Sequence, residues 1–211
     1  MDTLNLSAAL IVYNEEERLT KTLESIKDIA SEIIIIDSNS TDNTCAVAES
    51  FGAKIYNEEW RGFAAQKNSL TKKCTKEYIL YLDADEVIGD ELKKAVINAV
   101  KNGKSDGYYI RRKTHYLGKL LNYSWQKDER LRLVKASANP LWVGEIVHEE
   151  LKIQGSTSHL DGFIIHYSYR DIDDHFRRTI RYARLSFINS SAMNSVWGVF
   201  PAPPITILPT D

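Results

Sequence analysis

Several features that would place a chain in a particular class are scarce or missing in this 211-residue sequence. Cys45 and Cys74 are its two cysteines, too few and too isolated for a disulfide framework or a zinc site. The first residues lack the basic start and apolar core of a signal peptide, and no run reaches the roughly 18 apolar residues of a membrane span. A formal net charge of −2 argues against a general nucleic-acid binder. These absences predict a cytoplasmic globular protein without a nucleic-acid partner.

What the sequence does contain is a series of buried strands alternating with helices. Apolar runs at Leu6–Tyr13, Ile33–Ile36 and Tyr78–Leu82 are typical of strands buried on both faces, and Lys54–Tyr56 predicts a shorter strand. Helical spacing follows each run, and Asn14 with Glu17 forms a capping-box pattern, which predicts a helix that starts there and extends to Ala30. This alternation predicts an α/β fold, with a mostly parallel central sheet and helices on both faces.

Polar residues follow the three long strands at the point where each one ends. Because the carboxyl ends of parallel strands meet at one sheet edge, we expect these residues to converge there. Asp83 and Asp85 are two residues apart, so they project the same way from an extended chain and suit a hard divalent cation that bridges phosphate oxygens. The alternative is that they only cap the following turn and helix. The converging residues are Tyr13, Asn14, Asp37, Ser38, Asp83 and Asp85.

The second half of the chain has a different pattern. Segments 107–112, 129–134 and 147–153 alternate apolar with charged residues, which predicts mixed or antiparallel strands with one wet face. Asp90 is predicted to cap a helix between the halves. Residues 171–191 are predicted to form a last amphipathic helix with an arginine face. This face is either simply solvated or a contact with an anionic membrane surface. That face carries Arg177, Arg181 and Arg184.

Three motifs together resemble those of family 2 inverting glycosyltransferases. They are Leu10–Glu16 (LIVYNEE), Ile36–Thr44 (IDSNSTDNT) and Leu82–Glu86 (LDADE), and Gly62–Asn68 resembles the segment between the last two. Arg130–Leu133 and Val147–Glu149 further resemble the lipopolysaccharide inner-core β-glucosyltransferase branch. The resemblance covers about Leu6 to Ser191.

The resemblance implies a GT-A (Rossmann-like) fold and transfer of a hexose, with inversion, from a nucleotide-diphosphate sugar to a saccharide or glycolipid acceptor. In this branch the donor is expected to be UDP-glucose, the cofactor Mg²⁺ or Mn²⁺, and the pathway lipopolysaccharide or cell-surface glycan synthesis. Because no Pro-, Gly- or Ser-rich linker divides the halves, one domain is expected over residues 1–195, with a nucleotide-sugar half at 1–105 and an acceptor half with the last helix at 106–195. The Pro-rich residues 196–211 are expected to be a disordered tail, and the protein is expected to be cytoplasmic or peripheral on the inner membrane face.

Functional residues follow from the resemblance position by position. Inversion requires a single displacement, so one general base must deprotonate the acceptor hydroxyl. Asp128 is the first candidate for the base, with Glu129 and Glu149 as alternatives, although Asp128 also reads as a simple turn residue. His148 and His166 are each read as structural histidines or as ligands. Metal ligation is expected from Asp85, Asp83 and His148, and donor binding from Tyr13, Asn14, Glu16, Asp37, Ser38, Asn68, Asp83, Ala84 and Asp85.

Three other readings stay open beside this one. A sugar nucleotidyltransferase would need a glycine-rich loop after the first strand, where this chain has Tyr13 to Glu17. An aspartyl phosphotransferase would carry its nucleophile after the first strand rather than at Asp83. A protein of the same fold that binds a nucleotide sugar without turning it over is the non-enzyme alternative.

Overall fold

The computed structural model describes residues 4–121, 128–144, 149–169, 172–177 and 179–180. The chain divides into two compact units, Met1–Ser168 and Tyr169–Asp211. Two predicted residues of the arginine face, Arg181 and Arg184, lie outside the described residues, as do His148 and the Pro-rich tail.

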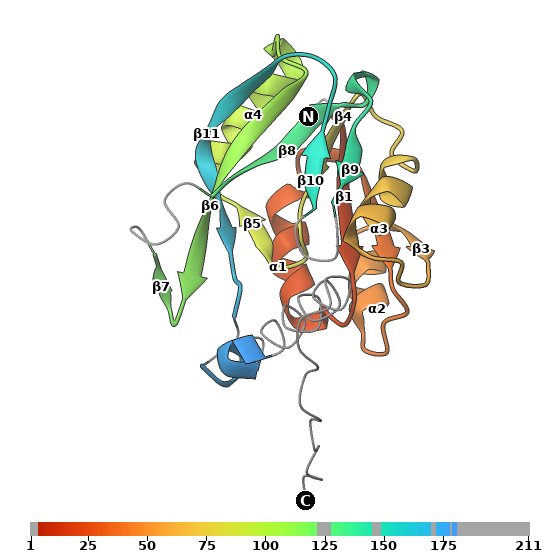
Figure 1. The fold of residues 1–211 in the computed structure, drawn as a ribbon, viewed down its shortest axis with the longest axis vertical. Helices are drawn as coiled ribbons and strands as arrows, with labels where there is room; N and C mark the ends of the chain where they lie inside the picture. Colours follow the sequence, from red (N-terminus) through yellow and green to blue (C-terminus); the bar gives the residue numbers. More distant parts are fainter. Residues whose placement is uncertain (1–3, 122–127, 145–148, 170–171, 178, 181–211) are drawn as a thin grey trace, which may run out of the picture. The chain divides into compact units, whose positions relative to one another are not determined.

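The first unit is built on one large sheet (Figure 1). Its strand order is β3-β2-β1-β4-β8-β6-β11-β5, with β7 added beside β6. The first four strands in this order are mutually parallel, whereas β8 runs antiparallel to both of its neighbours and β5 runs antiparallel to β11. The predicted mostly parallel α/β sheet is therefore confirmed. The strands are β1 Leu4–Val12, β2 Ala30–Asp37, β3 Lys54–Asn57, β4 Tyr78–Tyr81, β5 Glu86–Ile88, β6 Gly107–Tyr116, β7 Lys119–Leu120, β8 Glu129–Lys135 and β11 Thr157–His166.

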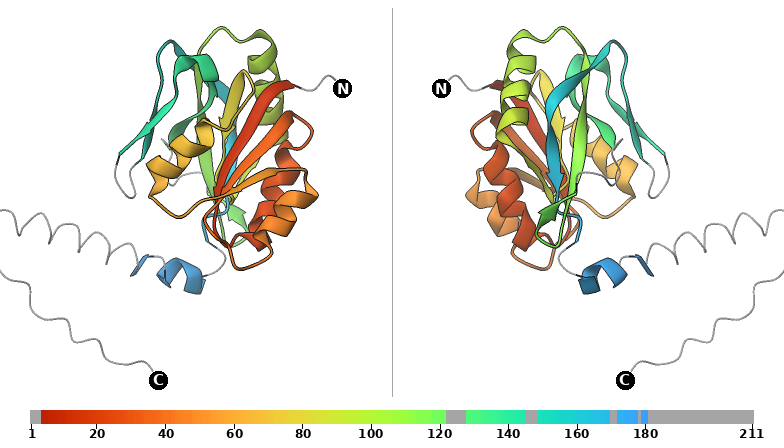
Figure 2. Two further views of the ribbon diagram at one scale, coloured as in Figure 1. Left: turned by 90° about the vertical axis from the view of Figure 1, so that its right-hand side faces the viewer. Right: turned by 90° about the vertical axis from the view of Figure 1, so that its left-hand side faces the viewer.

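Helices cover both faces of this sheet, as Figure 2 shows. On one face, Leu23 and Val96 pack with strand residues such as Leu10 in a large apolar core. On the other face, Leu70 packs with Ile36 and with a small hairpin. The alternation of inward and outward side chains in β1 and β2 supplies both cores, which is why these runs are continuously apolar. The helices are α1 Glu16–Ile26, α2 Thr44–Ser50, α3 Phe63–Thr71 and α4 Asp90–Asn102, and the hairpin consists of β9 Leu141–Val143 and β10 Glu150–Lys152, preceded by the 3₁₀ turn η1 Ala136–Ala138.

The predicted helix starts are wrong in detail. Glu15, not Asn14, occupies the N-cap position of α1, and no side chain caps the helix. Asn14 instead has φ 53°, a left-handed conformation that asparagine tolerates well. Likewise Gly89 precedes α4, and Asp90 is its first residue. The predicted first helix also ends too late, since Ala30 already belongs to β2.

In the second unit, residues 172–177 and 179–180 are helical, within the predicted last helix. Three apolar side chains of this helix, Ile172, Phe176 and Ile180, are 49%, 63% and 51% exposed. Within the described residues, no helix is long and apolar enough to cross a membrane.

Candidate active site

The ends of β1 and β2 are joined by interlocked loops. Val12 pairs with Asp37 across the two parallel strands, and the Ser38 amide donates to the Val12 carbonyl (3.0 Å). Asp37 is almost fully buried and accepts hydrogen bonds from the Ser40 amide (2.8 Å) and the Ser40 hydroxyl. The Ser40 hydroxyl in turn accepts from the Asn14 amide (2.9 Å). The predicted meeting of these strand ends is therefore confirmed, and Asp37 presents a carboxylate held by local donors.

Asn14 and Glu16 hold the same loops together from the other side. Asn14 Oδ1 accepts from the Thr41 amide (2.8 Å), and Glu16 Oε2 accepts from the amide (2.9 Å) and the side chain (2.8 Å) of Asn43. Tyr13 is 57% exposed beside them. Among the residues expected to bind the donor, Asn14 and Glu16 thus shape the loop, whereas the Tyr13 ring is open to a ligand.

Asp83 to Glu86 form the tight connection between β4 and β5. The Glu86 amide donates to the Asp83 carbonyl (3.0 Å), and Glu86 Oε2 accepts from the Asp83 amide (3.0 Å). From α1, the buried Thr22 hydroxyl donates to the Ala84 carbonyl (2.8 Å). Ala84 has no polar side chain, and its carbonyl is already bonded to Thr22. The turn therefore fixes the backbone, and the carboxylates of Asp83 and Asp85 make separate sets of contacts.

Asp83 is paired with two cations. Its carboxylate lies 2.9 Å from Arg132 Nη2 and 3.3 Å from Lys67 Nζ. Burial opposes ionisation, but the charges of Arg132 and Lys67 hold the pKa of Asp83 well below its usual range. Arg132 also contacts Glu86 at 2.8 Å, and burial raises the pKa of that carboxyl despite the arginine charge. Asp83 is thus ionised and oriented.

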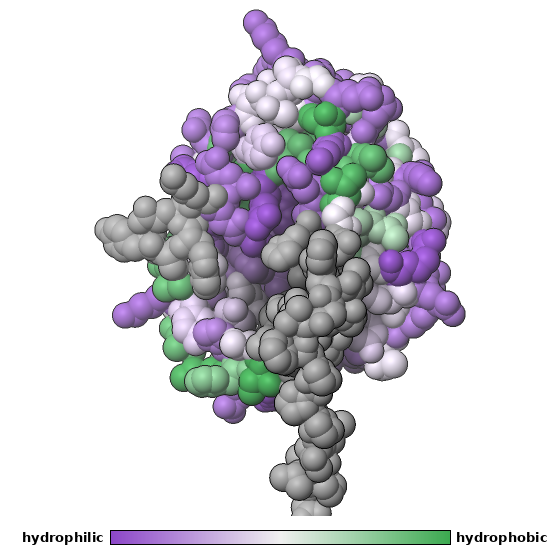
Figure 3. Space-filling model, viewed as in Figure 1, coloured by the Kyte–Doolittle hydropathy of each residue, from purple (hydrophilic) through white to green (hydrophobic). Residues whose placement is uncertain are grey.

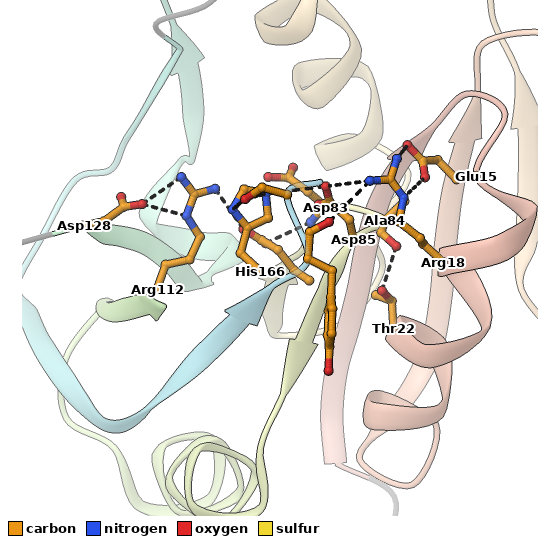
Figure 4. Close-up of polar contacts among 12 residues, drawn as sticks. Glu15, Arg18, Thr22, Asp83, Ala84, Asp85, Arg112, Asp128 and His166 are labelled. Carbon is orange, nitrogen blue, oxygen red and sulfur yellow. Dashed lines mark hydrogen bonds and ion pairs between the residues drawn. The ribbon is translucent and has the colours of Figure 1, made fainter. Parts of the chain in front are cut away.

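Asp85 lies among different partners (Figure 4). Its Oδ2 is 3.5 Å from Arg18 Nη1 and 3.4 Å from His166 Nε2. The Tyr167 amide donates to the Asp85 carbonyl (2.9 Å), and Arg18 Nη1 reaches the Tyr167 carbonyl at 3.4 Å. Arg18 is also held by Glu15 through two contacts of 2.7 and 2.8 Å. The end of β11 is thereby tied to the Asp83–Asp85 turn.

His166 and Arg18 are site residues that the sequence alone did not assign. His166 ends β11 opposite Glu86 of β5, and its Nδ1 is 2.8 Å from the Ser168 hydroxyl, which orients the ring. Sequence reasoning left His166 between a structural role and a ligand role. The available signal was its place directly after the apolar run Phe163–Ile165, because that run ends at the same sheet edge as Asp83.

The three candidate bases have distinct environments. Asp128 accepts from Arg112 Nε (2.8 Å) and Arg130 Nε (2.8 Å), so both of its oxygens are engaged. Burial opposes ionisation, but the two arginines lower the pKa of Asp128. Glu129, the next residue, is partly exposed and lies 3.4 Å from His159 Nδ1. Asp128 directly precedes β8, whose first residue is Glu129, and the two side chains have different partners.

Glu149 is brought next to the Asp83 turn. Its Oε1 lies 3.0 Å from Lys67 Nζ, and the same ammonium contacts Asp83. Asn68, predicted to bind the donor, instead donates to the Trp142 carbonyl (2.8 Å) and accepts from the Trp142 amide (2.9 Å). Asn68 therefore fixes α3 against the hairpin that leads to Glu149.

Gln66 is a further residue that the sequence did not assign. It is fully buried on α3, and its Nε2 donates to the Ser38 hydroxyl at 3.2 Å. Its Oε1 has no hydrogen-bond partner in the described part of the chain. Gln66 thus links α3 to the loop after β2 and keeps an unused acceptor at the site.

The oxygen-rich residues fit a divalent cation that a diphosphate would share. Within the described ranges, no group of three or more His, Cys, Asp or Glu side chains is arranged so that it could hold a metal ion unaided. Asp85 and His166 are close enough to contribute together, and Mg²⁺ commonly takes one or two carboxylates and completes its shell with phosphate oxygens and water. The donor set therefore matches a cation bound together with a nucleotide.

Comparison with known proteins agrees with this geometry. The model of the family described as "Glycosyl transferase family 2" matches residues 7–154. The chain is 28% identical over 190 residues to the lipopolysaccharide core biosynthesis glycosyltransferase LpsC of Rhizobium meliloti, covering 86% of this chain and 70% of that protein. It is 36% identical over 106 residues to an uncharacterized glycosyltransferase of Rickettsia conorii, covering 50% of this chain but 38% of that protein.

Solved structures show the same fold. The TarS fragment 1–349 of S. aureus, in complex with UDP, superposes with a TM-score of 0.58 at 17% identity, covering 78% of this chain and 60% of that one. The predicted GT-A fold is confirmed, and this chain spans less than two thirds of the TarS fragment. With the family model matching most of the first unit, the chain belongs to glycosyl transferase family 2.

Proposed function

We propose that this glycosyltransferase moves a hexose, with inversion, from a nucleotide-diphosphate sugar to a saccharide acceptor. The donor is UDP-glucose, and the acceptor is a saccharide or glycolipid of the lipopolysaccharide core or a related cell-surface glycan. The observation that carries the proposal is the convergence of Asp37, Asp83 and Asp85 at one sheet edge. The name of LpsC supports the acceptor class, and the UDP complex of TarS supports the nucleotide.

The donor would lie across the ends of β1, β2 and β4. Tyr13, which is exposed, offers a ring for the base, while Asp37 offers a carboxylate to the base or the ribose. Ser38 contributes a hydroxyl that Gln66 already orients. Asp83 faces the ribose or the cation. Near the centre of the face shown in Figure 3, hydrophilic residues (purple) lie around a hollow, with apolar residues (green) above it.

Asp85, with Asp83 beside it, would hold Mg²⁺ or Mn²⁺ against the diphosphate, and His166 would complete the protein ligands in place of or beside His148. Such a cation, when bound, acts as a Lewis acid that stabilises the negative charge of the leaving diphosphate. The chain's own part is to hold these side chains in place. Arg18 does so by fixing the backbone after β11, and Thr22 by fixing Ala84.

The acceptor hydroxyl needs a base, and the contacts favour Glu149 over Asp128. Both oxygens of Asp128 are engaged by arginines that lower its pKa, which weakens a carboxylate as a proton acceptor. Glu149 shares Lys67 with Asp83 and so lies beside the donor turn. Glu129 pairs with His159 and not with a residue of the Asp83 turn. We therefore propose Glu149 as the base, with Asp128 next.

We also propose that the helix of the second unit docks on an anionic membrane surface. Ile172, Phe176 and Ile180 recur at helical spacing and are exposed, and Arg177 follows Phe176. Apolar residues beside arginines are typical of helices that lie in the lipid interface. The protein should float together with vesicles that contain anionic lipid, and the Phe176→Asp variant should lose this binding. Flotation equal to that with neutral vesicles would contradict this proposal.

Donor binding is tested first by thermal shift with UDP-glucose, with and without Mn²⁺. The proposal expects stabilisation that depends on Mn²⁺ and that Asp85→Ala abolishes. Asp28→Ala is the matched control, because Asp28 is an exposed aspartate whose nearest cation, Lys93, is 3.8 Å away. Stabilisation that is indifferent to metal, or lost equally in the control, would argue against the site.

Turnover separates an enzyme from a protein that only binds the donor. UDP release should be measured with a panel of donors and with heptose-containing and simple saccharide acceptors. Release that rises with an acceptor above the blank is expected with UDP-glucose. Binding without any acceptor-dependent release would identify a non-catalytic member of the fold.

A further inference from the structure

Lys67 is a buried lysine placed between the two sides of the site. It belongs to α3 and is 4% exposed. Its ammonium lies 3.3 Å from Asp83 Oδ1 and 3.0 Å from Glu149 Oε1. These two carboxylates come from chain segments 66 residues apart, one from the turn after β4 and one from the approach to β10. Lys67 is therefore a direct link between the donor turn and the proposed base.

The ammonium has little freedom to move. It lies 4.4 Å from the centre of the Trp142 ring, a cation–π distance, and Trp142 is itself buried against Tyr81. Asn68, the next residue, ties α3 to the Trp142 backbone through two hydrogen bonds. Thr71, one turn later, bonds to the Lys67 carbonyl and to the Tyr81 hydroxyl, each at 2.7 Å. The lysine is thus anchored on a rigid surface.

Without this cation the arrangement would not hold. Asp83 and Glu149 would be neighbouring like charges in a poorly solvated place, and like charges at this range repel by an amount that low solvation increases. Asp83 would keep its ion pair with Arg132, whereas Glu149 forms no other ion pair among the described residues and is only near enough to Arg132 for its charge to help raise the Arg132 pKa. When Lys67 is replaced, Glu149 is therefore the side chain expected to move away from the Asp83 turn.

We propose that Lys67 is a positioning residue that holds Glu149 against the Asp83 turn and so sets the distance between the base and the donor. This inference rests on the proposed function for the role of Glu149. Lys67 itself contacts no reacting atom, and its effect passes through Glu149.

The test compares Lys67→Met with Lys73→Met. Lys73 is a matched control, since its ammonium lies 3.1 Å from Glu58 and 4.4 Å from the Tyr56 ring centre, away from the Asp83 turn. Lys67→Met should lower kcat by about 10²-fold, the loss that a displacement of about 1 Å can cause, with the KM for UDP-glucose changed by less than about threefold. Lys73→Met should leave both within about twofold. A change in KM alone would overturn the proposal.

A double-mutant cycle then asks whether Lys67 acts through Glu149. In the Glu149→Gln background, Lys67→Met should lower kcat by less than about threefold further, because the base is already absent. An equal loss in both backgrounds would overturn the proposal. Lys67→Arg, which keeps the charge, should recover at least about tenfold of the lost kcat.

A readout without turnover keeps the inference separate from the proposed function. Hydrogen exchange at Glu150–Lys152 should be faster in Lys67→Met than in Lys73→Met. If the wild type proves inactive but exchange is still faster in Lys67→Met, the transferase mechanism is rejected and the positioning role is retained. An active wild type with unchanged exchange and unchanged kcat in Lys67→Met would reject the positioning role alone.

Discussion

The two sides of the sheet build their part of the site by different means. Around β1 and β2, short polar side chains bond to nearby backbone, as Asp37 does with Ser40 and Asn14 with Thr41. Around β8 and β6, arginines and carboxylates from distant segments pair with one another, as Arg132 does with Asp83 and Glu86. The first arrangement is a set of hydrogen bonds between short polar side chains and loop backbone, and the second is a network of buried ion pairs. Substitutions on the two sides should therefore differ in how much unfolding free energy they cost and in how that cost depends on pH.

The largest effect is expected from Arg132→Met. Arg132 is 4% exposed, and its loss removes one of the two cations paired with each of Glu86 and Asp83, leaving Arg112 with Glu86 and Lys67 with Asp83, which costs about 3 kcal/mol of unfolding free energy. Urea denaturation at pH 7 measures it. Arg130→Met, at an arginine whose side chain is 54% exposed, is the control and should cost less than about 1 kcal/mol. Adding Glu86→Gln to Arg132→Met should recover part of the loss, and no recovery would show that packing rather than charge is responsible.

A smaller effect is expected on the hydrogen-bonded side from Asn14→Ala. It removes the acceptor for the Thr41 amide and places alanine at φ 53°, which together cost about 1–2 kcal/mol. Thermal and urea unfolding measure the change. Asn14→Gly separates the two causes, because glycine loses the same hydrogen bond without backbone strain. Equal losses in Ala and Gly would assign the whole cost to the bond.

The pH dependence should distinguish Asp128, which belongs to the ion-paired side. Its folded-state pKa is lowered, so its stabilising contribution is present above the unfolded value of about 3.9 and is lost as pH falls through the folded value. Asp128→Asn should therefore be less stable than wild type by about 1 kcal/mol at pH 7, and the gap should narrow below about pH 4. A gap that is constant between pH 7 and pH 3 would contradict this assignment.

The smallest effect is expected from Glu129→Gln. Glu129 pairs with His159, whose side chain is 65% exposed, and such pairs contribute less than about 1 kcal/mol. Because Glu129 pairs with His159 and not with the Asp83 turn, acceptor-dependent UDP release should also stay within about threefold of wild type. A large loss of release with normal stability would return Glu129 to the list of candidate bases.

The same contrast explains what the sequence predicts well. The buried runs at Leu6 and Ile33 have few alternatives, so the parallel sheet and the meeting of Asn14, Asp37 and Asp83 follow from local pattern. The helix caps were wrong because Asn14 uses its side chain on the neighbouring loop rather than on its own helix. Local sequence cannot tell these two partners apart.

The ion-paired side was harder to predict because its contacts join segments far apart in the chain. Lys67 and Glu149 are 82 positions apart in the sequence, and Arg132 and Asp83 are 49 positions apart. Nothing near Lys67 in the sequence marks it as buried, since lysine is ordinarily exposed. His166 was undervalued for a similar reason, because β11 was not recognised as a strand that returns to the same edge.

Asn68 has a consequence for the chemical ageing of the protein. Its side-chain amide mimics a neighbouring strand, donating to the Trp142 carbonyl and accepting from the Trp142 amide. Deamidation to aspartate would replace the donor by an anionic oxygen directed at that carbonyl, so one bond would become a repulsion. A gain of negative charge at Asn68 in stored protein should therefore loosen the hairpin leading to Glu149. Storage history is thus a variable in any measurement of acceptor transfer.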